Sequence, residues 1–187
     1  MVLIGSVLSA ALIRNFLLTS PARPVLAQQT IAPHVQGVNY GLPIRLEIPA
    51  IKVDAALDYV GLTSQGELGV PAGPANVAWY AQGPRPGEVG DAVIDGHFGY
   101  KDNIPAVFDN LHMLQKGDRL YVKDVKGFTT TFVVRDLQTY NPDESATAVF
   151  RSSDGKAHLN LITCEGTWNN TRKSFSNRLV VFADKEI

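Results

Sequence analysis

Short β-like segments, separated by glycine and proline turns, constrain this fold more than any other feature of the sequence. From residue 43 onward, apolar residues recur mostly with the two-residue period of a strand, as Ile44, Leu46 and Ile48 do. The segment 83–87 reads Gly-Pro-Arg-Pro-Gly and excludes a helix or central strand there, because proline lacks a backbone donor and glycine favours turns. No strand–helix–strand rhythm runs through the chain, so a doubly wound parallel sheet is not expected.

About eight strands and one short helix follow from this pattern. Phe108 to Leu114 has local helical spacing, with apolar residues roughly one turn apart. We therefore expect a mostly β fold with one or two short helices, in which the strands form an antiparallel or mixed barrel, or a closed sandwich. The expected strands are 43–49, 53–62, 76–80, 91–95, 119–125, 128–140, 158–164 and 177–183.

The first 42 residues differ in composition from the rest. Residues 1–19 are largely apolar, and the uninterrupted part is shorter than the span of about 20 residues that a membrane helix needs. They predict either a membrane anchor, with Arg14 at the interface, or an amphipathic helix folded against the domain. Residues 20–42 contain three prolines without a sustained period and predict a spacer. A helix followed by a spacer fits export and tethering at a membrane face, and residues 43–187 form one domain.

The charge balance argues against a polyanionic partner. The chain has 17 basic and 18 acidic residues, and no dense cluster of lysine and arginine. Nucleic-acid binding usually requires a basic excess or stripe. We therefore expect no nucleic-acid partner.

Three residues whose types suit acyl transfer lie at or beside expected strand ends. His97 follows the strand 91–95, Cys164 ends another strand, and Arg178 opens the last one. A thiolate is the reactive form of cysteine, and an imidazole can take the thiol proton or protonate a leaving amine. Arginine keeps its charge, so it suits an oxyanion or a substrate carbonyl. Backbone N–H groups after Cys164, where Gly166 permits an unusual turn, can complete an oxyanion hole.

Each of these residues also has a structural interpretation. Cys164 is the only cysteine and can be a buried, inert thiol. His97 can be a hydrogen-bonded structural histidine, and Arg178 an ordinary surface cation. The combination is more specific than any one member, because all three fall at expected strand boundaries.

The motifs around these residues resemble the signature of the sortase family. They are Ile-Asp-Gly-His at 94–97, Leu-Asn-Leu-Ile-Thr-Cys at 159–164 and Asn-Arg-Leu-Val-Val-Phe-Ala at 177–183. The family signature is a Gly-His after a strand, a Leu-x-Thr-Cys strand end, and an arginine before an apolar last strand. The resemblance covers about residues 43–183, and the stretch 83–87 is most similar to the group called class F.

This resemblance implies an eight-stranded sortase barrel, spanning residues 43–187, in an exported, membrane-anchored cysteine transpeptidase of a bacterial cell surface. Cys164 would attack the Thr–Gly carbonyl of a Leu-Pro-x-Thr-Gly-like sorting signal on a surface protein. His97 would act as general acid and base, and Arg178 would hold the substrate and stabilise the oxyanion. An amine of a cell-wall peptide or a pilin lysine would release the acyl-enzyme. The family chemistry needs no cofactor, and no metal site is assigned.

Other residues near the proposed nucleophile are expected to contact the substrate. Thr163, Glu165 and Trp168 flank Cys164, and Trp168 can instead serve packing. Asp95 shares a strand face with His97, so it can orient that ring and raise its pKa, or cap the turn at Gly96. The remaining histidines, His34, His112 and His158, are expected to be structural.

Two alternatives to a sortase remain at this stage. An L,D-transpeptidase acting on peptidoglycan carries an arginine very close after its cysteine, whereas this chain has none before Arg172. A non-catalytic surface-binding barrel is the second alternative, and the intact cysteine, histidine and arginine set argues against it.

Overall fold

The structure is a computed structural model that describes residues 38–99 and 104–187. The helix predicted for residues 1–19 and most of the spacer predicted for residues 20–42 lie outside these ranges. None of the helices found in the two ranges has the length and apolar character of a membrane span.

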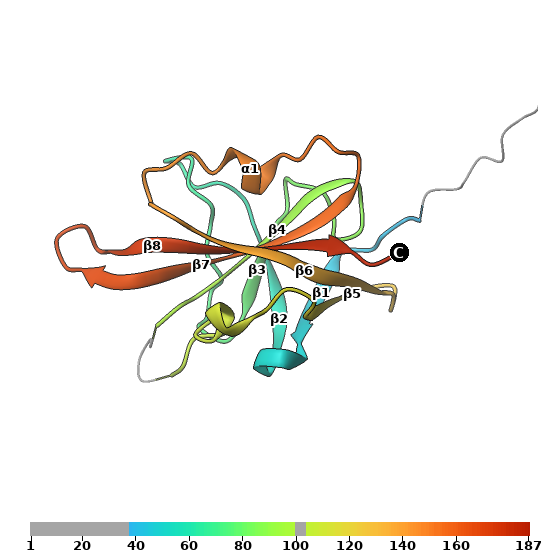
Figure 1. Ribbon diagram of the computed structural model, residues 1–187, viewed down its shortest axis with the longest axis horizontal. Helices are drawn as coiled ribbons and strands as arrows, with labels where there is room; N and C mark the ends of the chain where they lie inside the picture. Colours follow the sequence, from blue (N-terminus) through green and yellow to red (C-terminus); the bar gives the residue numbers. More distant parts are fainter. Residues whose placement is uncertain (1–37, 100–103) are drawn as a thin grey trace, which may run out of the picture. The chain divides into compact units, whose positions relative to one another are not determined.

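The described residues form a closed barrel of eight strands, as the sequence pattern predicted. Around the barrel the order of strands is β1-β2-β3-β4-β7-β8-β6-β5 (Figure 1). The strands are β1 (Pro43–Ile48), β2 (Val53–Val60), β3 (Val77–Tyr80), β4 (Gly90–Gly96), β5 (Arg119–Asp124), β6 (Thr129–Tyr140), β7 (Ala157–Asn169) and β8 (Ser174–Lys185).

The barrel is mixed rather than antiparallel. Two neighbouring pairs, β2 with β3 and β4 with β7, run parallel, and the other pairs run antiparallel. A parallel pair needs a long crossover between its strands. For β4 and β7 that crossover contains β5, β6 and a short helix, so neighbouring strands come from distant parts of the sequence.

The last two strands are longer than the sequence predicted. We expected Cys164 to end a strand and Arg178 to begin one, and both expectations are wrong. Pairing between β7 and β8 continues past these residues to Asn169 and Ser174, across an irregularity between Glu165 and Trp168. Gly166, at which the sequence predicted an unusual turn, lies in this bulge at φ +86°, so the strands bend and continue. The two strands run out together as the hairpin at the left of Figure 1.

Helical structure is sparse. The helical spacing of Phe108 to Leu114 corresponds to one 3₁₀ turn, η2 (Leu111–Met113). Two further turns, η1 (Pro49–Ile51) and α1 (Thr147–Phe150), were not predicted individually. Each is too short to show an apolar period in the sequence.

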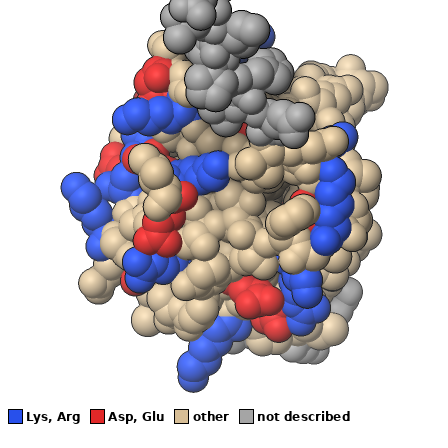
Figure 2. Space-filling model, turned by 90° about the vertical axis from the view of Figure 1, so that its right-hand side faces the viewer, with Lys and Arg blue, Asp and Glu red and all other residues tan. Residues whose placement is uncertain are grey.

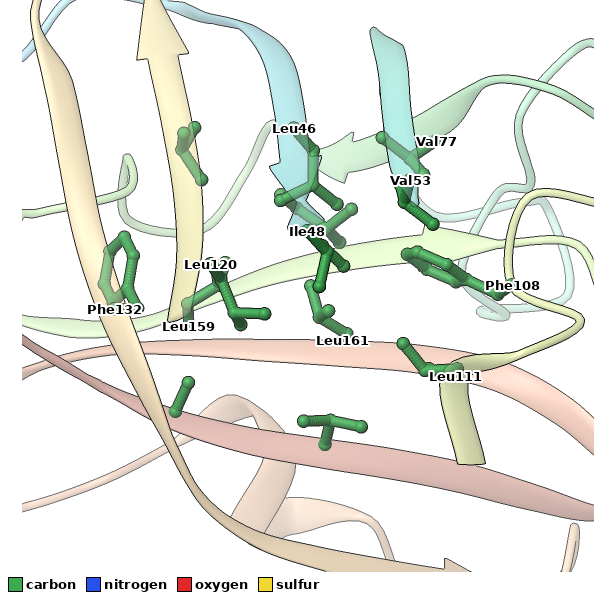
Figure 3. Packing of buried hydrophobic residues seen from close by; sticks show 14 of the residues in the cluster. Leu46, Ile48, Val53, Val77, Phe108, Leu111, Leu120, Phe132, Leu159 and Leu161 are labelled. Carbon is green, nitrogen blue, oxygen red and sulfur yellow. The ribbon is translucent and has the colours of Figure 1, made fainter. Parts of the chain in front are cut away.

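Apolar side chains from all eight strands and η2 fill the barrel. Leu46 and Ile48 from β1, Leu120 from β5 and Phe132 from β6 are fully buried. Figure 3 shows them pointing into the same interior as residues of the other elements. The remaining labelled side chains are Val53, Val77, Phe108, Leu111, Leu159 and Leu161.

Phe108 packs closely against the end of β4. A Cβ atom built on Gly96 would overlap the Phe108 ring, so the close approach requires glycine at this position. The Phe108 N–H also donates to the carbonyl of His97 at 3.1 Å. The segment that precedes η2 therefore holds Gly96 and His97 in place through Phe108, whose ring lies inside the barrel.

A second, smaller apolar cluster lies on the outer face of β7 and β8. Val149 of α1 packs there with Val180 and Phe182 of β8. The buried Asn160 of β7 holds α1 against the sheet, because its Nδ2 donates to the Val149 carbonyl at 2.7 Å and to Asp91 at 3.1 Å. The α1 segment thus covers one part of the sheet surface, and the neighbouring part carries the candidate site.

His158, expected to be structural, joins three segments at the other end of β7. Its ring is buried, with Nδ1 2.7 Å from Asp184 of β8 and Nε2 3.0 Å from Asp154 of the preceding loop. Because a carboxylate only accepts, two such bonds favour the doubly protonated ring. Burial alone lowers the pKa of His158, but the two carboxylates outweigh it and raise the pKa above its usual value.

Charged side chains are otherwise mixed over the surface. Figure 2 shows one face, on whose described part lysines and arginines lie among aspartates and glutamates without an extended patch of one sign. The surface pairs include Arg45 with Asp54 and Arg119 with Glu186. This distribution agrees with the balanced charge of the sequence.

The Gly96→Ala substitution tests the contact between β4 and Phe108. The added methyl group must displace the ring, which we expect to destabilise the fold by about 1–3 kcal/mol. Urea unfolding of the wild type and the variant measures this loss. Gly73→Ala is the control, because a Cβ atom there meets nothing within 4 Å. Equal losses in the two variants would contradict the prediction.

The His158→Gln substitution tests the protonated ring. A raised folded-state pKa stabilises the fold fully below the ordinary value of 6.5, and the contribution disappears as pH rises through the raised value. We therefore expect the free-energy difference between wild type and variant to be greatest in mild acid and to shrink toward alkaline pH. Denaturant unfolding at a series of pH values checks this, and a difference that grows with pH would refute it.

Candidate functional site

The pairing of β4, β7 and β8 brings the three candidate residues together. Cys164 on β7 lies directly opposite Arg178 on β8. On the other side of β7, the parallel register places Asp95 beside Ile162. His97 directly follows the last residue of β4, at the end of the strand that lies next to Cys164.

These side chains share the outer face of the sheet and line one cavity. Inward-facing residues of β7 and β8, such as Leu161 and Val181, belong to the barrel core, so Cys164 and Arg178 lie on the opposite face. The cavity has a volume of about 350 Å³. It is lined by Asp95, Gly96, His97, Cys164 and Arg178, together with Glu67, Leu68, Val70, Pro142, Phe150 and Ile162.

His97 is fixed by a backbone contact. Its Nε2 lies 3.0 Å from the carbonyl oxygen of Pro71, in the loop between β2 and β3. A carbonyl oxygen only accepts hydrogen bonds, so Nε2 carries the proton of this bond. Nδ1 is then the ring nitrogen that can exchange a proton with Cys164.

Cys164 is half-buried beside one positive and one negative group. Burial raises the pKa of its thiol, the Arg178 guanidinium lowers it, and the charge of Asp95 raises it further. The net effect is an increase, which favours the uncharged thiol at neutral pH. Attack on a substrate therefore requires a base that removes the thiol proton.

Arg178 is anchored on the β7–β8 hairpin. Its Nη1 donates to the carbonyl oxygens of Asn177 at 3.0 Å and Phe175 at 3.3 Å. Guanidinium has five N–H donors in a planar fork. This anchoring therefore leaves donors on Nε and Nη2 for a group that enters the cavity.

Asp95 has neighbours that the sequence did not predict. Strand periodicity placed it on the face of His97, and the structure adds Arg178 and Cys164 from two other strands. Burial raises the pKa of Asp95 to about 7, against the opposing effects of Arg178 and of the Gly96 backbone N–H. Arg178 is therefore the charged side chain that acts on this carboxyl, and the carboxyl in turn raises the pKa of Cys164.

The residues expected to flank the substrate differ in their exposure. Thr163 is buried, and its hydroxyl donates to the Gly96 carbonyl at 2.7 Å, which ties β7 to the end of β4. Glu165 accepts a hydrogen bond from Thr139 at 2.9 Å. The exposed Trp168 packs edge-to-face on Phe175, with ring centroids 5.2 Å apart.

A second cavity, of about 300 Å³, also borders Cys164. Its lining includes Thr163, Glu165, Phe98 and His112. His112 was expected to be structural, and its place beside this cavity gave no signal in the sequence, since it lies in a 3₁₀ turn 15 residues after His97. Glu67 and Phe150 of the first cavity were missed for the same reason, because they come from a loop and from α1.

The described part of the chain contains no group of three or more histidine, cysteine, aspartate or glutamate side chains arranged to hold a metal ion. His158 lies six residues before Cys164 on β7 and is bound to Asp154 and Asp184. It takes no part in the cavity around Cys164.

Comparison with known proteins identifies the family. The model of the sortase domain matches residues 46–186. Sortase C-1 from Actinomyces oris is 29% identical with a TM-score of 0.59, over 78% of this chain and 75% of that one.

Two further solved structures show a likeness of fold. Sortase A from Corynebacterium diphtheriae is 22% identical, with a TM-score of 0.58 over 79% of this chain and 62% of that one. Sortase C from Clostridium perfringens SM101 is 21% identical, with a TM-score of 0.57 over 79% and 72%. A search of curated proteins gives no match. The family model covers most of the chain and the barrel has the sortase architecture, so this protein belongs to the sortase family.

Proposed function

We propose that this sortase is a cysteine transpeptidase that cleaves a Leu-Pro-x-Thr-Gly-like sorting signal between Thr and Gly. It would join the acyl product to an amine on the cell wall or a pilin. The observation that carries the proposal is the opposition of Cys164 and Arg178 across β7 and β8, at a cavity that His97 also lines. Surface proteins with a C-terminal sorting signal would be its substrates.

The first half of the reaction uses Cys164 and His97. Since burial keeps the thiol protonated, Nδ1 of His97 takes the proton as Sγ attacks the threonine carbonyl carbon. The tetrahedral intermediate collapses when the C–N bond to glycine breaks, and the imidazolium protonates the leaving amine. A thioester between the threonine acyl group and Cys164 remains.

Arg178 stabilises the charge that develops during attack. The guanidinium cannot lose its proton, and its donors on Nε and Nη2 can meet the carbonyl oxygen as it becomes an oxyanion. Its Nη1 bonds to the hairpin carbonyls hold the side chain near Cys164 before the substrate arrives. Arg178 therefore needs little reorganisation during the reaction.

The second half of the reaction transfers the acyl group to an amine. The amine nitrogen attacks the thioester carbonyl, gives a proton to the neutral imidazole of His97 and forms an amide. The thiolate leaves and is reprotonated, which restores Cys164. This chemistry draws on side chains alone and requires no cofactor.

We further infer that Glu165 and Trp168 contact the bound peptide. Both lie on β7 just beyond Cys164, and Trp168 is 49% exposed on the hairpin. Thr163 acts differently, since its buried hydroxyl holds Gly96 and thereby the backbone before His97. It would support the site by aligning β4 with β7.

The location and subclass are part of the same proposal. Sortases act at the cell surface, and residues 1–19 would anchor this one to the membrane, with residues 20–42 as the spacer before the catalytic domain. The Gly-Pro-Arg-Pro-Gly stretch at 83–87 supports class F. In the fold this stretch is held by the Trp79 indole, which donates to the Pro84 carbonyl at 3.1 Å.

Intact-protein mass spectrometry tests the function directly. Incubated with a pool of Leu-Pro-x-Thr-Gly peptides, the wild type should gain the mass of the acyl fragment, and added amine should remove it. Cys164→Ala should gain nothing. Absence of an adduct on a readily alkylated wild type would overturn the sorting-signal substrate, and an unreactive Cys164 would favour the non-catalytic barrel.

The Arg178→Gln substitution separates oxyanion stabilisation from thiol activation. We expect acylation by peptide to slow by about 100- to 1,000-fold, as for the loss of one oxyanion donor. Because Arg178 lowers the pKa of Cys164, its removal should also move the pH midpoint of iodoacetamide alkylation to a higher value. Arg178→Lys keeps the positive charge. Its alkylation midpoint should therefore stay close to that of the wild type, while its acylation rate should still fall. Wild-type acylation rates in Arg178→Gln would refute the assignment.

A further inference from the structure

Asp95 is a carboxyl group at the site for which the proposed reaction has no use. It lies on β4, two residues before His97, on the face that also carries the candidate residues. Among the described residues it forms no ion pair and no hydrogen bond with another side chain, although its pKa is raised by burial to about 7. A group this costly to bury is expected to have a nearby partner.

Arg178 is the complementary group in the same cavity. Only its Nη1 is bonded, to two carbonyl oxygens of the hairpin, so an edge of the guanidinium formed by Nε and Nη2 has no described partner. A carboxylate can accept from one donor of that edge, which leaves the other donor for the substrate carbonyl. Arg178 already acts electrostatically on Asp95, since its charge lowers the pKa of that carboxyl against the effect of burial.

Among the described residues that line the cavity, Arg178 is the only one with a guanidinium or ammonium group. The same cavity is lined by His97, which follows β4, by Cys164 of β7, and by Glu67 of the loop after β2. The segment around α1 contributes only Pro142 and Phe150. A negative charge at Asp95 therefore attracts Arg178 into the cavity, and no other carboxyl group on the sheet strands lines this space.

We propose that Asp95 is a positioning residue for Arg178. Its carboxylate attracts one donor of the unbonded edge and so directs the other donor toward the position of the substrate carbonyl beside Cys164, while the hairpin carbonyls hold Nη1. The inference rests on the proposed function, in which Arg178 stabilises the oxyanion. It assigns to Asp95 a role that acts through Arg178.

A double-mutant cycle tests whether Asp95 acts through Arg178. The four proteins are the wild type, Asp95→Asn, Arg178→Gln and the double variant, each assayed well above pH 7, where the ionised form of Asp95 predominates. We expect Asp95→Asn to slow peptide acylation by about 10- to 100-fold in the wild type, which is the usual cost of a misplaced group. In the Arg178→Gln background it should have almost no further effect.

Alkylation of Cys164 by iodoacetamide supplies a second readout that needs no peptide. Its pH midpoint reports both charges, because Asp95 raises the pKa of the thiol and Arg178 lowers it. If Asp95 positions Arg178, the shift caused by Asp95→Asn should differ between the two backgrounds. Additive shifts in the midpoint, together with additive effects on acylation, would overturn the proposal.

Two controls complete the experiment. Asp95→Glu keeps the charge and should restore part of the acylation rate, which a purely structural role would not predict. Asp54→Asn removes one negative charge at an exposed position on β2, paired with Arg45, and should change neither readout. The two proposals can fail separately. If the wild type forms no peptide adduct, but the midpoint shifts of the two single variants do not add up in the double variant, the proposed function is refuted and the positioning role is kept.

Discussion

Backbone pairing of β7 with its two neighbours is the constraint on which the rest of the site depends. The antiparallel register with β8 sets Cys164 opposite Arg178, and the parallel register with β4 brings the end of that strand alongside. A shift of one residue in either pairing would send these side chains into the barrel interior. The buried Thr163 hydroxyl, bonded to the Gly96 carbonyl, and the close approach of Phe108 to Gly96 both oppose such a shift.

Burial then determines how the aligned groups behave. The same desolvation that keeps the Cys164 thiol protonated also raises the pKa of Asp95, while Arg178 favours the charged form of both. Because these groups interact, their protons come off as a coupled set rather than one residue at a time. The groups that set the pKa values of the site therefore come from three different strands.

Much of the fold and the identity of the candidate residues could be predicted from the sequence. Alternation of apolar residues located the strands, and the residue types at His97, Cys164 and Arg178 indicated acyl-transfer chemistry. The strand ends around Cys164 could not be predicted, because Gly166 has the same sequence signature in a bulge as in a terminating turn. The neighbours of Asp95 were also beyond prediction, because they depend on a register between strands 67 residues apart. A four-residue helix such as α1 is too short to leave a period at all.

The parallel pairing of β4 with β7 also has a consequence for folding kinetics. The chain must form β5, β6 and α1 between these partners, so the loop closure that joins them is long and its entropic cost is paid before the contact is gained. Barrel closure needs β8 between β6 and β7, and β8 is the strand that carries Arg178. Cys164 and Arg178 can meet early in the local β7–β8 hairpin, whereas β4 joins β7 only after the long loop closure. The complete candidate site, with Asp95 and His97, therefore arises only after β4 has paired with β7.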